Sequence, residues 1–276
     1  MSGLCHSFLQ IADRVWREID EADRAGLSYG EETITETILL ELNRNHSVNV
    51  RIRAFSKQVE EPKNGSDWEW WIGRPGSWLG MRIQAKKVKL PNELFHRLQT
   101  YETKSMPDTQ INTLIKVAAQ DKLNPAYCLY VHSRKVAPLW RNGARCSAPS
   151  MSRNQYGCLI ADALAAKSTG SNKLADLAHV SFPWHCLACD CAGSSDDGGT
   201  LAENAVAALK QSREMSGERG FGMLEIDRQI FEPVQELPEY MHGLVEGPDD
   251  GERDGILFGR AIERRLKGFV LLQEGE

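Results

Sequence analysis

The chain of 276 residues contains 41% hydrophobic and 26% charged residues, an ordinary globular composition that excludes a fibrous or largely disordered protein. Its net charge of −5 argues against a protein that coats nucleic acid over its whole surface, and its longest apolar runs are far shorter than the roughly 20 residues that cross a bilayer. The first ten residues show no secretory signal, and the seven cysteines are irregularly spaced. We therefore expect a reduced, cytoplasmic chain with no membrane association rather than a disulfide framework.

Charge is distributed unevenly along the chain. Residues 48–90 contain nine lysines and arginines against four acids, a local charge of +5, whereas residues 225–255 contain ten acids and two arginines, a local charge of −8. A basic segment within an acidic protein can bind phosphate locally. A solvated charged surface gives the same pattern, so charge alone does not identify a function.

Helical spacing of apolar residues predicts two helices at the start, over residues 8–25 and 30–46. Alternation with period two then predicts strands near 48–56, 67–73 and 78–88, with Pro- and Gly-containing turns after the first two. Because these strands follow one another with short links, we expect a three-strand meander in which they are sequential neighbours in one sheet.

A crossover connection follows the three strands. Apolar spacing predicts a helix over 108–122, and an apolar run predicts a buried strand over 126–131. A strand that follows a crossover helix can pair in parallel with an earlier strand of the sheet. The order helix, three strands, helix, strand therefore predicts an α/β core over residues 1–135.

The second half of the chain has weaker patterns. Residues 136–276 are expected to pack on the core as an extension, because no Pro- or Gly-rich linker follows residue 132. Its predicted helices are 158–167 and 201–211, its predicted strands are 221–230 and 269–273, and its predicted loops are 193–199 and 246–255.

Candidate functional side chains lie on the second and third predicted strands. Asp67 and Glu69 share one face of the second strand, and Gln84 and Lys86 share one face of the third, because each pair is two residues apart. On neighbouring strands, a carboxylate, an amide and an ammonium would converge. Mg²⁺ takes oxygen ligands of this kind, and a nearby lysine can meet negative charge on a phosphate. Solvated strand faces are the alternative, chiefly for Glu69 and Lys86.

This pattern resembles the PD-(D/E)XK nuclease superfamily, whose acidic residue sits on the second strand and whose (D/E)-x-K motif sits on the third. The matching segments are Gly65-Ser66-Asp67 and Gln84-Ala85-Lys86. Gln84 departs from the usual Glu or Asp, although Q-x-K variants exist, especially in Mrr-like restriction branches. The resemblance covers roughly residues 30–132 and implies a restriction-endonuclease-like core.

The same superfamily often carries a glutamate on the helix before the strands. On a helical wheel, Glu31 falls with the apolar residues that face the sheet, Glu32 lies beside that face, and Glu36 points further away. We therefore expect Glu31, and then Glu32, to join the site. Acids that suit the dipole of a helix N-terminus are the alternative interpretation.

The resemblance implies a metal-dependent endonuclease that hydrolyses DNA phosphodiester bonds, with DNA a better substrate candidate than RNA. Asp67 and Glu31 would hold Mg²⁺ or Mn²⁺, with Glu32 and Glu69 as further candidate ligands. Gln84 would add its amide oxygen or orient water, and Lys86 would stabilise charge. A bacterial restriction or anti-phage setting is implied, with a homodimer or a partner protein of such a defence system. The alternative is a catalytically degenerate binding or structural module on the same fold.

A third class of function would place the activity in the C-terminal half. Cys186, Cys189 and Cys191 follow His185 at a spacing that can contribute zinc ligands. A structural zinc site usually needs a second ligand pair, which is absent at normal spacing. Free buried cysteines are the simpler interpretation.

Overall fold

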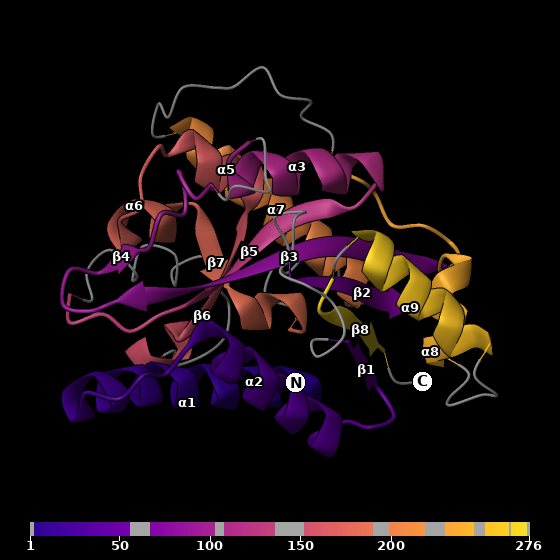
Figure 1. Ribbon diagram of the computed structural model, residues 1–276, viewed down its shortest axis with the longest axis horizontal. Coiled ribbons are helices and arrows are strands. Elements are labelled where there is room, and N and C mark those ends of the chain that lie inside the picture. Colours follow the sequence, from indigo (N-terminus) through magenta and orange to yellow (C-terminus); the bar gives the residue numbers. More distant parts are fainter. Residues whose placement is uncertain are drawn as a thin grey trace.

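The computed structural model describes residues 3–55, 67–102, 108–135, 152–189, 199–218, 230–245, 252–264 and 266–274. These residues form an α/β fold in which helices cover an open, mixed β-sheet (Figure 1). Within them, no helix is both long enough and apolar enough to span a membrane.

Eight strands of the described residues form this sheet, in the order β1-β8-β2-β3-β5-β6-β7, with β4 paired to β3. β2 pairs in parallel with β8, β3 pairs in parallel with β5, and the other pairs are antiparallel. The strands are β1 (Val50–Ala54), β2 (Trp68–Arg74), β3 (Ser77–Lys89), β4 (Leu94–Phe95), β5 (Asn124–Tyr130), β6 (Cys158–Asp162), β7 (Ser181–Pro183) and β8 (Gly268–Gln273).

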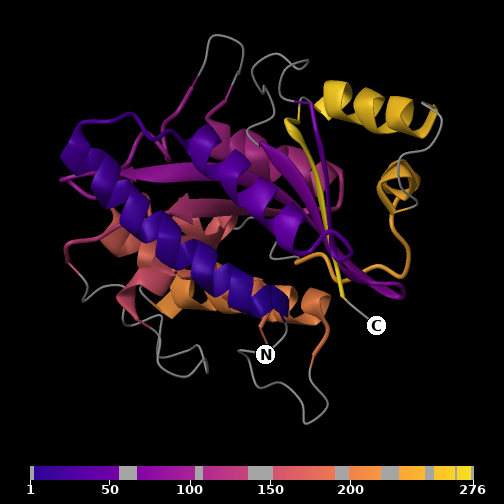
Figure 2. The same ribbon diagram turned by 90° about the horizontal axis from the view of Figure 1, so that it is seen from below.

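Helices lie on both sides of the sheet. In Figure 1, α1 and α2 run along one side while α3 and α5 run along the other, and Figure 2 shows α1 and α2 crossing over the sheet. The helices are α1 (Gly3–Ala25), α2 (Glu31–Asn45), α3 (Gln110–Gln120), α5 (Ala163–Ser168), α6 (Leu174–His179), α7 (Leu201–Glu218), α8 (His242–Val245) and α9 (Glu252–Arg264), with 3₁₀ turns η1 (Arg153–Tyr156), η2 (Trp184–Leu187) and η3 (Glu239–Met241).

The amphipathic pattern of the first helices explains how they pack. In α1, Phe8, Ile11 and Val15 are fully buried, and in α2, Ile34 and Leu42 are fully buried. These side chains recur at helical spacing, so each helix presents one apolar stripe to the sheet. The predicted helices over 8–25 and 30–46 are therefore confirmed, as is the predicted pairing of the strand over 126–131, which is β5, in parallel with β3.

The predicted three-strand meander is wrong at one point. β2 and β3 are antiparallel neighbours as expected, but β8 lies between β1 and β2. β8 is parallel to β2, with Trp68 opposite Gly268, and antiparallel to β1, with Val50 opposite Leu272. The first five residues of β8 are all buried, as expected for a strand inside a sheet, whereas β1 is only partly buried.

Several further predictions need correction. Residues 158–162 form β6 rather than the start of a helix, and residues 252–255 are helical rather than part of a loop. The predicted strand over 221–230 and the predicted loop over 193–199 lie almost wholly outside the described residues. The expectation of a fully reduced chain is also wrong, because Cys5 of α1 forms a disulfide with Cys189.

A buried network of charges fastens α9 to the sheet. Arg82 of β3 is fully buried and pairs with Glu69 at 2.8 Å and with Asp121 at 2.8 Å. From α9, Arg260 and Arg264 reach the same Asp121 carboxylate at 3.1 and 2.6 Å. A buried acid needs such partners, because removing one of them leaves an uncompensated charge in the interior.

Gly268 at the start of β8 is predicted to tolerate no side chain. A Cβ there would lie 2.3 Å from the Arg53 carbonyl oxygen and 2.5 Å from a Trp68 ring carbon. Gly268→Ala should therefore lower the free energy of unfolding by about 1–3 kcal/mol, the usual cost of overpacking, as measured by urea denaturation. The matched control is Gly259→Ala in α9, where a Cβ meets nothing within 4 Å. Equal effects of the two substitutions would contradict the close approach of β8 to β1 and β2.

Candidate metal-binding site

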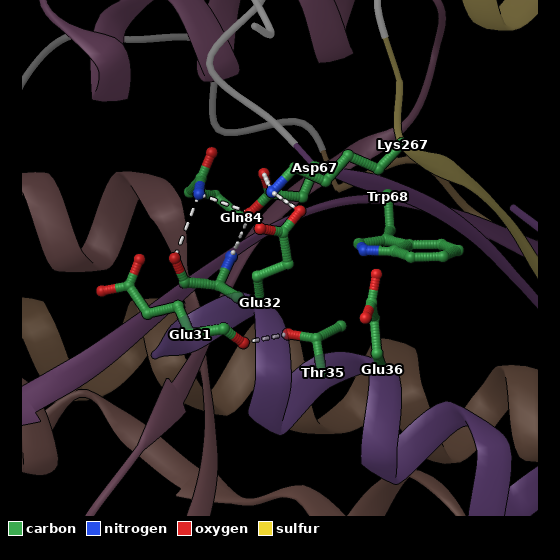
Figure 3. A pocket seen from close by; sticks show the side chains of 9 residues that line it. Glu31, Glu32, Thr35, Glu36, Asp67, Trp68, Gln84 and Lys267 are labelled. Carbon is green, nitrogen blue, oxygen red and sulfur yellow. Dashed lines mark hydrogen bonds and ion pairs between the residues drawn. The ribbon is translucent and has the colours of Figure 1, made fainter. Parts of the chain in front are cut away.

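A small pocket lies where the N-terminal turn of α2 meets β2 and β3 (Figure 3). Its volume of about 60 Å³ has room for a few water molecules. The lining includes four carboxylates, three from α2 and one from the residue just before β2, and one lysine. The lining residues are Glu31, Glu32, Thr35, Glu36, Asp67, Trp68, Gln84, Ala85 and Lys267.

Asp67 is the most buried carboxylate of the pocket. It directly precedes β2, and its backbone N–H donates to the Ile83 carbonyl, so its position is fixed by the β2–β3 pairing. Its Oδ2 accepts hydrogen bonds from the Gln84 amide at 2.6 Å and from the Ala85 N–H at 3.2 Å. Its Oδ1 lies 3.3 Å from Lys267 Nζ. Three donors therefore compensate the charge of this carboxylate, as burial demands.

Gln84 has an orientation that the sequence does not predict. Its Nε2 faces Asp67, while its Oε1 accepts a hydrogen bond from Gln110 Nε2 at 3.0 Å. The expected metal-facing amide oxygen is thus turned away, because the amide N–H compensates the buried carboxylate. Gln110 Oε1 is buried and has no hydrogen-bond partner among the described residues. Turning both amides over would give that oxygen a donor, but it would set Gln84 Oε1 against Asp67 Oδ2 and the Ala85 carbonyl, an arrangement that needs a cation between these oxygens.

The three α2 glutamates occupy different parts of the pocket. Glu31 Oε1 accepts the Lys87 backbone N–H at 2.9 Å, which holds this carboxylate at β3 rather than beside Asp67. Glu32 Oε1 lies 3.6 Å from Lys267 Nζ, so Glu32 shares this ammonium with Asp67. Glu36 lines the pocket near Trp68 instead of pointing away as its wheel position suggests (Figure 3). Glu32, rather than Glu31, therefore stands across the ammonium from Asp67.

Lys267 is the pocket residue that sequence reasoning missed. Its N–H donates to the Asp67 carbonyl at 2.7 Å, and its carbonyl accepts the Phe55 N–H at 2.6 Å. Burial by itself lowers the pKa of Lys267, but the charges of Asp67 and Glu32 outweigh it, so the pKa is raised above its ordinary value. The sequence gives no sign that Lys267 lies near Asp67, because the two residues are far apart in the chain. The pairing of β8 with β2 brings them together.

Lys86 and Glu69 do not line the pocket. The Lys86 ammonium lies over the Tyr101 ring, 5.2 Å from its centre. Glu69 is fully buried, where its Oε1 accepts from Trp71 at 2.9 Å and its Oε2 pairs with Arg82. Glu69 Oε1 also accepts the Tyr240 hydroxyl at 2.5 Å. Its partners are therefore those of the network around Arg82, away from Asp67.

The pocket residues fit a hard divalent cation. Four carboxylates and one ammonium give a formal charge of −3, and Asp67 and Glu32 already share one positive group. Mg²⁺ commonly binds through one or two carboxylates and keeps several waters, so two acids suffice. No set of three or more His, Cys, Asp or Glu side chains is gathered for a metal in the part of the chain that the structure describes.

The suggested zinc ligands are not assembled. Cys189 is joined to Cys5 in a disulfide, so its sulfur is not available as a thiolate. Cys186 is buried and is not part of a disulfide, and Cys191 lies outside the described residues. The geometry therefore offers no argument for zinc at this segment.

Comparison with known proteins places the chain in a family without identifying its activity. No curated protein and no solved structure matches it. The model of a family of unknown function, DUF6615, matches residues 4–275, which is nearly the whole chain. The chain therefore belongs to the DUF6615 family.

Proposed function

We propose that this protein is a metal-dependent nuclease with a restriction-endonuclease-like core, which hydrolyses phosphodiester bonds in DNA. The observation that carries the proposal is the sharing of one cation, the Lys267 ammonium, by two carboxylates of the pocket, Asp67 and Glu32. A place where two acids already share positive charge suits a divalent metal. The restriction or anti-phage setting and the cytoplasmic location stay predictions.

The order of elements around the pocket supports the fold part of this proposal. α2 is followed by the β2–β3 hairpin, by α3, and by β5 in parallel with β3. Asp67 directly precedes the first of these strands and Gln84 lies on the second, close to the superfamily pattern. The insertion of β8 beside β2 departs from a simple meander without displacing Asp67 from Gln84.

The pocket residues have distinct roles in the proposed reaction. When bound, the metal would lower the pKa of a water and meet the charge that develops on the phosphoryl group. Asp67 and Glu32 would hold the metal, and Glu31 would keep the α2 turn against β3 through its bond to Lys87. Gln84, with its amide turned over, would orient a water or add a neutral oxygen ligand.

A basic surface beside the pocket supports a nucleic acid substrate. Lys89, His96 and Arg97 are exposed on β3 and around β4. The charge of Lys89, slight burial, and the charges of Arg97 and Lys86 lower the pKa of His96. Because the Lys87 backbone contacts Glu31, this end of β3 adjoins the pocket. Phosphates bound along it would approach the metal site.

A degenerate nuclease is the second candidate. It is favoured by the internal compensation of Asp67, since Gln84, Ala85 and Lys267 satisfy this carboxylate without a metal. On this alternative the protein binds nucleic acid through the basic surface and does not cut it. Cleavage assays separate the two candidates.

Cleavage is predicted to require a metal and Asp67. The wild-type protein should cut DNA with Mg²⁺ or Mn²⁺ and not with EDTA, as followed on labelled duplex and single-stranded substrates. Asp67→Asn should lower the single-turnover rate by about 100-fold or more, through weaker metal binding. The matched control is Asp13→Asn on α1, whose exposed i,i+4 pair with Arg17 contributes little to stability. Equal rates for wild type and Asp67→Asn would contradict the proposed role.

Gln84→Glu separates an active site from a degenerate one. The substitution adds a charged ligand at the position where the superfamily usually carries an acid, so an active enzyme should keep its rate or need less metal. The measurement is the Mg²⁺ concentration that gives half-maximal cleavage. If only the Gln84→Glu variant cuts, the wild-type site is degenerate. If neither protein cuts DNA or binds Mn²⁺, the nuclease proposal is wrong.

The basic surface formed by Lys89, His96 and Arg97 is predicted to make DNA binding depend on salt concentration. The double variant Lys89→Glu, Arg97→Glu should bind uncut DNA more weakly in Ca²⁺, because two phosphate contacts are lost. The slope of log K against log salt should fall by about 0.9 per lost contact. The control with the same charge change is Arg44→Glu, Lys116→Glu on exposed positions of α2 and α3. An equal loss in both variants would show nonspecific electrostatics rather than a defined surface.

A further inference from the structure

We propose that Lys267, not Lys86, is the catalytic ammonium of this site, and that it holds the metal's place between Asp67 and Glu32 until the metal binds. This inference rests on the proposed function and adds to it a catalytic residue from the C-terminal half of the chain.

The position of the Lys267 ammonium supports its role as a place-holder for the metal. Nζ lies 3.3 Å from Asp67 Oδ1 and 3.6 Å from Glu32 Oε1. Figure 3 shows the side chain of Lys267, the residue just before β8, reaching toward the carboxylates of Asp67 and Glu32. Without a positive charge there, the two acids would repel each other in a partly enclosed pocket. The ammonium thus occupies the location that electrostatics favours for a cation.

The main chain of Lys267 is fixed while its side chain can move. Hydrogen bonds join its N–H to the Asp67 carbonyl and its carbonyl to the Phe55 N–H, and β8 begins at the next residue. The four-carbon stem of lysine is flexible. A divalent cation, with twice the charge, can displace the ammonium from the carboxylates while the backbone keeps the lysine at the rim of the site. Once displaced, the Lys267 ammonium no longer neutralises Asp67 and Glu32, and it becomes a positive group available beside the metal.

Lys86 is less suited to this role. Its ammonium lies over the Tyr101 ring, and the side chain is not part of the pocket lining. A cation on an aromatic face is already partly compensated. The Lys86 side chain is buried, so its charge is compensated within the protein and away from the pocket.

In the proposed reaction, Lys267 stabilises negative charge and does not transfer a proton. The oxygen of the attacking water forms a bond to phosphorus, and the bond from phosphorus to the leaving oxygen breaks. The attacking water releases a proton to solvent, and the leaving oxygen takes one from solvent. Lys267 keeps its proton throughout and approaches the phosphoryl oxygens on which negative charge accumulates.

The test compares Lys267→Met, Lys267→Arg and Lys86→Met with the full-length wild-type protein. Met keeps an unbranched apolar stem, and circular dichroism checks that each variant is folded. The first readout is the affinity for Mn²⁺ without nucleic acid, by calorimetry or electron paramagnetic resonance. The second is the single-turnover rate of DNA cleavage at saturating Mn²⁺.

Lys267→Met should bind Mn²⁺ roughly tenfold more tightly, because a competing positive charge is gone. It should also cut about 100-fold or more slowly, because the charge is missing in the transition state. Lys267→Arg should regain part of the rate, and Lys86→Met should match wild type in Mn²⁺ affinity.

Two results overturn the inference: unchanged Mn²⁺ affinity in Lys267→Met, or a greater loss of cleavage rate at saturating Mn²⁺ in Lys86→Met than in Lys267→Met. Failure of the proposed function looks different. In that case wild-type protein leaves DNA uncut at saturating Mn²⁺, which overturns the catalytic part, while tighter Mn²⁺ binding by Lys267→Met still supports the place-holding part. Absence of Mn²⁺ binding in both proteins overturns both parts.

Discussion

The parallel pairing of β8 with β2 is the interaction on which the rest of this structure depends. It covers an edge of β2 that would otherwise expose unpaired backbone groups, and it places β1 at the outside of the sheet. It also brings the preceding helix, α9, over the face that carries Trp71 and Phe269. Because the pairing begins at Gly268, the residue just before it arrives beside Asp67. One strand thus joins the two halves of the chain in a common core and in a common pocket.

Charges on β2 and β3 are divided between a closed cluster and an open one. Glu69, Arg82 and Asp121 are almost completely buried, and their partners come from within the protein. Only two residues earlier, Asp67 opens into a pocket whose carboxylates outnumber its ammonium groups. In the closed cluster, arginines pair with both carboxylates and hold α9 in place, whereas the open cluster has negative charge in excess. Buried acids that are close in sequence can therefore either stabilise the fold or line an open pocket, depending on whether neighbouring elements cover them.

Periodicity predicted most elements of the first half, because α1, α2, β2, β3, α3 and β5 each bury one regular stripe or run of apolar residues. The spacing of Asp67 and Gln84 also predicted their contact, since antiparallel neighbours place these positions side by side. The strand over 269–273 was predicted and is β8, but periodicity does not tell which strands pair when they are distant in sequence, so its place beside β2 and the role of Lys267 were missed. It also does not reveal which end of the Gln84 amide faces the carboxylate, because that depends on the donors that the buried Asp67 needs and on the contact with Gln110. Glu69 was misassigned because its partners Arg82 and Tyr240 lie on the opposite strand and in the C-terminal half.

The position of β8 also has a consequence for biosynthesis. A ribosome makes β1 and β2 long before β8, so the two strands cannot take up their final spacing while the chain is emerging. Pairings of such long sequence separation form late and slowly. Until β8 enters, the carboxylates of α2 and β2 lack their ammonium and the pocket is incomplete. On the proposed function, a nascent chain would therefore lack a complete site until the last strand of the sheet has folded in.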